Sequence, residues 1–149
     1  MTFVDNVPYM RIPHNSPMEN FIILKAAKIA ESRKKTVSQQ QTILESISEQ
    51  QGFLFGMIDI EAGSRVADPA MAIITDHLHR AAGTFDAQTN VQHRFEQLVE
   101  AINEELARAA GEPDWALDID DLHALVGVVA DQTMYLTGTG ELLALFMHR

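Results

Sequence analysis

Two stretches in the C-terminal third of the chain are almost purely apolar, and they restrict its fold more than any other feature. Leu122 to Ala130 contains a single polar residue, His123, and Leu142 to Met147 contains none. A strand with one face in water alternates apolar and polar residues, whereas a strand covered on both faces does not. Both stretches are far shorter than the roughly 18 residues of a membrane span. We therefore predict strands that are covered on both faces.

The composition narrows the class of protein. A chain of 149 residues with 46% hydrophobic and 21% charged residues is typical of one globular domain. A net charge of -10 without a basic stripe argues against nucleic-acid binding, because phosphates would be repelled. The absence of cysteine excludes disulfides, thiolate metal sites and a cysteine nucleophile. With neither a membrane span nor a signal-peptide core in the first residues, we expect a cytoplasmic protein without membrane contact.

The N-terminal part is predicted to be an extended arm followed by a helix. Residues 1–15 contain Pro8 and Pro13 and show no apolar periodicity. Ser16 and Glu19 match a capping box, and Pro17 suits the first helical position. We expect a helix from 17 to about 34, and a single α+β domain over 16–149.

The segment 36–48 fits either a helix or a strand. Ile43 and Ile47 suit both periodicities. We favour a strand, because residues 49–52 resemble a turn before the apolar run from Phe53 to Ile60. The two runs would then form a hairpin.

Two amphipathic helices follow. One apolar stripe runs from Val66 to Ala81, and Gly83 is expected to end that helix in the left-handed conformation. The other stripe runs from Val91 to Leu106, opened by Thr89 or Asn90 and closed by Gly111 and Pro113. His77 and His79 lie two apart on the first helix, so they face different sides and cannot share a metal.

Strands predicted at 122–130, 133–137 and 142–148 complete an antiparallel sheet with the two long helices on one face. The helices cover only that face, so the helix at 17–35 or a second copy of the chain must cover the other. The expected interface residues lie in the apolar strands: Leu125, Val126, Val128, Leu143, Leu145 and Phe146.

Three pieces of the chain, in this order, resemble a known family. Asp59 ends an apolar strand and is followed by a loop of small residues and a helix. A helix ends with residues 101–106, Ala-Ile-Asn-Glu-Glu-Leu, and paired strands flank Gly140-Glu141-Leu142. Residues 53–149 thus resemble the N-terminal half of the type 2C metal-dependent protein serine/threonine phosphatases. The resemblance implies half of a two-sheet sandwich and, in an active member, two Mg²⁺ or Mn²⁺ ions.

The departures from that family concern its chemistry. Asp59 matches the bridging aspartate, but Ile60 replaces the glycine whose carbonyl reaches the metal. The other metal carboxylates belong to the family's C-terminal half, which has no counterpart here. Asp59 and Glu61 are the only pair we would assign to a metal, and no catalytic residue is assigned. We expect Asp59 to be structural, accepting amides of the turn 61–64 and capping the next helix.

Three functional hypotheses follow. The first is a catalytically inactive phosphatase-like domain that acts as a protein-interaction or regulatory assembly module, without a cofactor, and binds a protein partner or a second copy. The second is the N-terminal part of an active Mg- or Mn-dependent protein serine/threonine phosphatase. The third is an unrelated small α+β dimerisation module.

Overall fold

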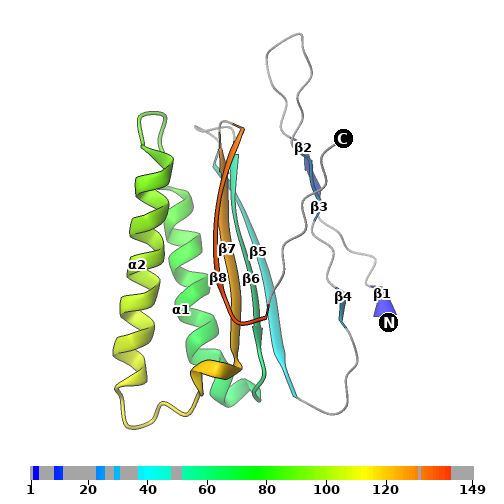
Figure 1. Ribbon diagram of the computed structural model, residues 1–149, viewed down its shortest axis with the longest axis vertical. Coiled ribbons are helices and arrows are strands. Elements are labelled where there is room, and N and C mark those ends of the chain that lie inside the picture. The colour runs from blue at the N-terminus through cyan, green and yellow to red at the C-terminus, as the bar shows by residue number, and fades with distance from the viewer. Residues whose placement is uncertain are drawn as a thin grey trace. The chain divides into compact units, whose positions relative to one another are not determined.

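The computed structural model (Figure 1) describes residues 37–47, 52–130 and 132–141 in full, together with the backbone of four short strands before them. The chain divides into two compact units, 1–36 and 37–149. This division falls later than the boundary at 15/16 expected between arm and domain. The two units are treated separately below.

The first unit contains two pairs of short antiparallel strands. β1 (Thr2–Phe3) pairs with β4 (Ile29–Ala30), and β2 (Tyr9–Arg11) pairs with β3 (Ile23–Lys25). The helix predicted from 17 to 34 is therefore not confirmed. The described residues in that range are the extended strands β3 and β4, and the others lie outside the described residues. Isoleucine is β-branched and suits a strand better than a helix.

The described residues of the second unit form a four-stranded antiparallel sheet. Its strands are β5 (Gln39–Ile47), β6 (Gly52–Ile60), β7 (Leu122–Ala130) and β8 (Thr133–Thr139), in the order β5-β6-β7-β8. The strand preferred for 36–48 and its antiparallel pairing with β6 are confirmed. The strand expected at 142–148 lies outside the described residues.

Two long helices cover one face of this sheet (Figure 1), which confirms the α+β class. α1 (Ser64–Ala82) packs against β5 and β6, and α2 (Val91–Ala110) packs against α1 and β7. A short 3₁₀ turn, η2 (Ile119–Asp121), leads from α2 into β7. The core between sheet and helices includes residues from every layer: Ile43, Ile47, Leu54, Ile58, Ile74, Leu78, Phe95, Leu98, Ile102, Val126 and Val128.

The N-terminus of α2 and the C-terminus of α1 are each closed by a side chain that hydrogen-bonds the backbone. Asn90 caps α2 as predicted, because its side-chain oxygen accepts a hydrogen bond from the His93 amide at 2.9 Å. The left-handed stop predicted at Gly83 is wrong, since its φ is -76°. Thr84 ends α1 instead, donating both its backbone N–H and its hydroxyl to the carbonyl of Ala81 at 2.8 and 2.7 Å.

The face opposite the helices, called the second face, is also apolar. The residues of β6 and β7 that strand alternation places there include Phe53, Phe55, Leu125 and Val129. Each of the four is buried, and the two phenylalanine rings lie with their centroids 6.2 Å apart. Both faces of β6 and β7 are therefore buried, as their continuous apolar sequences predict.

Candidate functional site

Asp59, the first predicted metal ligand, lies next to last in β6 and belongs to the second face. It is opposite Gln40 of β5 and His123 of β7 in the strand ladder. The side-chain amide of Gln40 donates a hydrogen bond to Asp59 Oδ2 at 2.7 Å. The other oxygen, Oδ1, is shielded from solvent and has no hydrogen-bond partner in the described part of the chain.

Glu61, the second predicted ligand, opens the loop after β6. Its backbone N–H donates to the carbonyl of Asp121 at 2.9 Å, which joins the loop to η2. Its carboxylate oxygen Oε1 lies 3.6 Å from His123 Nε2. Both predicted ligands are therefore neighbours of His123. Asp59 lies across from it in the strand ladder, and the carboxylate of Glu61 approaches its ring.

The ring of His123 is oriented by the end of β8. The backbone N–H of Glu141 donates to His123 Nδ1 at 3.0 Å, so the neutral ring carries its proton on Nε2, facing Glu61. Gly140 makes this approach possible. Its φ is +76°, and a Cβ there would lie 2.1 Å from Nδ1.

The cluster around His123 brings two carboxylates near one imidazole ring. Hard divalent cations need several oxygen ligands, and the described residues contain no group of three or more histidines, cysteines or carboxylates arranged to hold one. Ile60, in place of the family's glycine, is fully buried in the core beneath the helices.

The expectation that Asp59 caps α1 is wrong. The N-cap of α1 is Gly63, and no side chain bonds the free amides there. The reason is the strand alternation: Asp59 projects from the second face, whereas α1 crosses the opposite one. Its carboxylate bonds Gln40 of the neighbouring strand instead.

The predicted interface residues are divided between the two faces. Leu125 belongs to the second face, whereas Val126 and Val128 lie in the core under the helices. The remaining three, Leu143, Leu145 and Phe146, lie outside the described residues.

A groove between α2 and β8 was not anticipated from the sequence. It has a volume of about 750 Å³, and residues from both elements line it: Gln92, Phe95, Glu96, Val99, Glu100, Asn103, Glu104, Met134, Tyr135, Leu136 and Thr137. Phe95 is buried, and the three glutamates are exposed on successive turns of α2. On the opposite wall, Tyr135 and Thr137 occupy the β8 positions that face the helices, whereas Met134 and Leu136, 38% and 36% exposed, belong to the second face. Glu96, Glu100 and Glu104 follow one another at intervals of four residues, and this spacing in the sequence could have predicted an acidic face of the helix.

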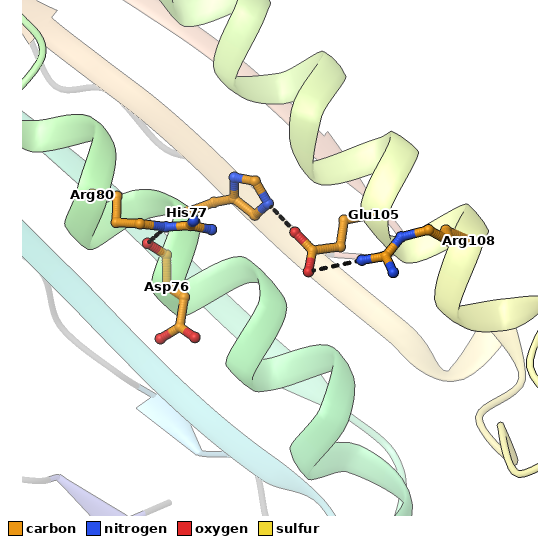
Figure 2. A network of polar contacts seen from close by, with 5 residues as sticks. All are labelled: Asp76, His77, Arg80, Glu105 and Arg108. Carbon is orange, nitrogen blue, oxygen red and sulfur yellow. Dashed lines mark hydrogen bonds and ion pairs between the residues drawn. The ribbon is translucent and has the colours of Figure 1, made fainter.

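A polar network fixes α2, and hence one wall of the groove, against α1 (Figure 2). His77 of α1 meets Glu105 of α2 at 2.5 Å, and Arg108 donates to the other oxygen of Glu105 at 3.3 Å. The hydrogen bond from His77 is the main reason that the pKa of Glu105 lies below its ordinary value of 4.5. Burial, the second cause, acts in the opposite direction.

His79 faces the other side of α1, as its spacing from His77 predicts. Its Nδ1 pairs with the carboxylate of Glu45 on β5. Near it, the hydroxyl of Thr75 donates to the side-chain oxygen of Gln41 at 3.4 Å. α1 is thus linked to α2 on one side and to the edge strand β5 on the other.

Comparison with protein-family models, with curated proteins and with solved structures finds no match to this chain. Among the described residues, neither α1 nor α2 combines the length and apolarity that crossing a bilayer requires. The function must therefore be argued from the geometry of the sheet and its groove.

Proposed function

We propose that this chain is a protein-interaction or regulatory assembly domain, with the architecture of an inactive phosphatase half. The observation that carries the proposal is the edge strand β8. Within the described part of the chain, β8 pairs with β7 on one side and with no strand on the other. An edge strand offers unpaired N–H and C=O groups, a ready template for another chain.

The side chains of β8 support this role. Natural edge strands that avoid partners are protected by charges, prolines or bulges. β8 reads Thr-Met-Tyr-Leu-Thr-Gly-Thr, with neither a charge nor a proline. Met134 and Leu136 add exposed apolar surface to the unpaired backbone. β5, the other edge, is more polar, with three glutamines and Glu45.

The cluster around Asp59 supports a domain without phosphatase activity. One oxygen of Asp59 is bonded to Gln40, and the backbone carbonyl of Ile60 accepts a hydrogen bond from the N–H of Ala62 at 2.8 Å. The phosphatase-like part of the proposal rests on two features of the sheet. Helices cover one face, and the second face, which carries Asp59, is apolar. If the chain were instead the N-terminal part of an active enzyme, Oδ1 of Asp59, which has no hydrogen-bond partner among the described residues, would be the atom to receive Mg²⁺ or Mn²⁺.

Site-specific photo-crosslinking in cells would test the interaction function. A photoreactive phenylalanine analogue replaces Met134 of β8, and a control variant carries it at Asp68, an exposed position of α1. We expect covalent adducts with a second protein chain from position 134 in excess of those from position 68. Equal yields at the two positions would contradict the assignment of β8 as the interaction surface.

A further inference from the structure

The groove beside β8 has two walls of different chemistry. On the β8 side lie Tyr135 and Thr137, whose strand positions face the helices, and the outer edge of β8, which pairs with no strand in the described part of the chain. On the α2 side, Glu96, Glu100 and Glu104 project from successive turns. The buried ring of Phe95 belongs to the lining between them. A ligand that fills the groove must therefore satisfy backbone groups and carboxylates at the same time.

The three glutamates project from the same side of α2, and no lysine or arginine of the described residues forms an ion pair with them. Like charges four residues apart on a helix repel. No lysine or arginine is among the residues that line the groove. Glu96 accepts a hydrogen bond from the neutral amide of Gln92 at 3.0 Å, and the described structure contains no ion pair to Glu100 or Glu104. The groove therefore favours a cationic occupant.

The spacing of these carboxylates matches that of an extended chain. Residues four apart on a helix are separated by about 6 Å along its axis. Alternate residues of a strand are separated by about 6.6 Å, and they point to the same face of the sheet. α2 and β8 both line the groove, and their axes run in nearly the same direction in Figure 1. A strand added outside β8 could thus place every second side chain beside one of the glutamates.

We propose that this groove binds an extended basic segment of a partner protein, which adds to the sheet as a strand beside β8. Lysine or arginine at alternate positions of the segment pairs with Glu96, Glu100 and Glu104. The intervening apolar residues lie next to Met134 and Leu136 on the second face. This assignment rests on the proposed interaction function and specifies its partner.

A second copy of this chain is a poor occupant of the same groove. Pairing β8 with another β8 would bring a strand without any lysine or arginine. It would also bring the second copy's own glutamates into the neighbourhood, in a chain whose net charge is already -10. Charge therefore selects a basic partner over self-association at this edge.

A model peptide tests the proposal directly. The probe is a fluorescent peptide of the same length as β8 that alternates lysine and valine, compared with a peptide of identical composition whose lysines are contiguous. Binding is measured by anisotropy at about 150 mM salt, where long-range attraction is largely screened. Amide chemical shifts of the labelled full chain locate the site. We expect the alternating peptide to bind more tightly and to shift amides of Thr133–Thr139 and of α2.

Charge variants show whether binding depends on the glutamates of the groove or on the net negative charge of the chain. The combined change Glu96→Gln, Glu100→Gln and Glu104→Gln should weaken binding by about tenfold. A control removes three exposed carboxylates elsewhere, Asp68→Asn, Glu112→Gln and Asp114→Asn, and should leave the affinity within about twofold. Leu136→Lys, which places a cation on the edge itself, should also weaken binding and provides a second variant if the triple change unfolds the domain.

The outcomes distinguish the proposal of a basic strand partner from the proposal that the chain is an interaction domain. Equal binding of the two peptides, equal effects of the two triple variants, or shifts confined to another surface would each overturn the basic-strand assignment. If position 134 still crosslinks to a partner in cells, the interaction function stands while the partner chemistry proposed here fails. If position 134 captures nothing and no peptide binds, both proposals fail.

Discussion

His77 of α1 and Glu105 of α2 meet at 2.5 Å, although 28 residues separate them in the sequence. Because Arg108 also donates to Glu105, this carboxylate receives hydrogen bonds from both helices. The bond fixes the position of α2 over the sheet, and with it the acidic wall of the groove.

The first prediction concerns the pH dependence of this link. The pKa of Glu105 is lowered in the folded state, so its contribution to stability is present above its ordinary pKa of 4.5 and is lost as the pH falls through the lowered value. Glu105→Gln should therefore lower the thermal midpoint near neutral pH, and the difference from the unsubstituted chain should disappear in strong acid. Thermal unfolding followed by circular dichroism at a series of pH values measures it. A difference that is independent of pH would argue against the ionised carboxylate as its source.

The second prediction concerns Gly140. Alanine there would have to adopt a φ of +76° and would meet the ring of His123. We expect Gly140→Ala to lower the free energy of unfolding by about 1–3 kcal/mol. Gly63→Ala is the matched control, because its φ is -64° and no atom lies within 4 Å of the added carbon. Urea denaturation of both variants gives the comparison, and similar losses would show that the fit against His123 is unimportant.

The third prediction tests the end of α1. Gly83 has ordinary right-handed dihedrals, and its nearest neighbour to an added Cβ is a carbonyl at 4.0 Å. Gly83→Ala should therefore stabilise the domain, by about 0.4–1 kcal/mol, because it restricts the unfolded chain. A loss of more than about 1 kcal/mol in urea denaturation would instead indicate a left-handed conformation at this position.

The fourth prediction concerns packing on the second face. A Cβ at Gly127 would lie 2.4 Å from the ring of Phe55, so the ring or the strand would have to move. Gly127→Ala should cost about 1–3 kcal/mol through overpacking. The double variant Gly127→Ala with Phe55→Leu should recover part of that loss. Failure of the smaller side chain to rescue any stability would contradict the contact.

The fifth prediction concerns catalysis. With Mn²⁺ present, the chain should hydrolyse an aryl phosphate no faster than Asp59→Asn does, because Asp59 is bonded to Gln40 and belongs to no group of three or more potential metal ligands among the described residues. Steady-state release of the phenol and calorimetric titration with Mn²⁺ measure activity and affinity. Metal-dependent turnover that Asp59→Asn abolishes would favour the active-phosphatase hypothesis.

The elements with strong periodicity could be predicted from the sequence. The apolar stripes of α1 and α2 and the continuous runs of β6 and β7 determine which surfaces are buried, and the structure has these elements where they were expected. Asn90 acts through a local hydrogen bond, so its capping role was also predictable. The helix predicted from 17 to 34 relied on a capping pattern, and the isoleucines within it suit a strand better than a helix.

The candidate site was predicted less well, because it depends on contacts between distant segments. Asp59 was expected to cap α1, but a correct prediction depends on the face of β6 on which Asp59 lies. The acidic stripe of α2 becomes one wall of a groove only because β8, some 30 residues later, lies beside it. Neither relationship is encoded in local periodicity.

The neighbours Asp59 and Ile60 lie on opposite faces of β6: the polar side chain of Asp59 is on the second face, and the apolar side chain of Ile60 is in the core. Sliding β6 by a single position against the helices would exchange them, driving a carboxylate into hydrocarbon and pushing an isoleucine out. Gln40 and His123 would at the same time lose their places across from the aspartate. These two adjacent side chains therefore fix the register of β6 within the sheet. This structural role requires neither a metal nor a substrate.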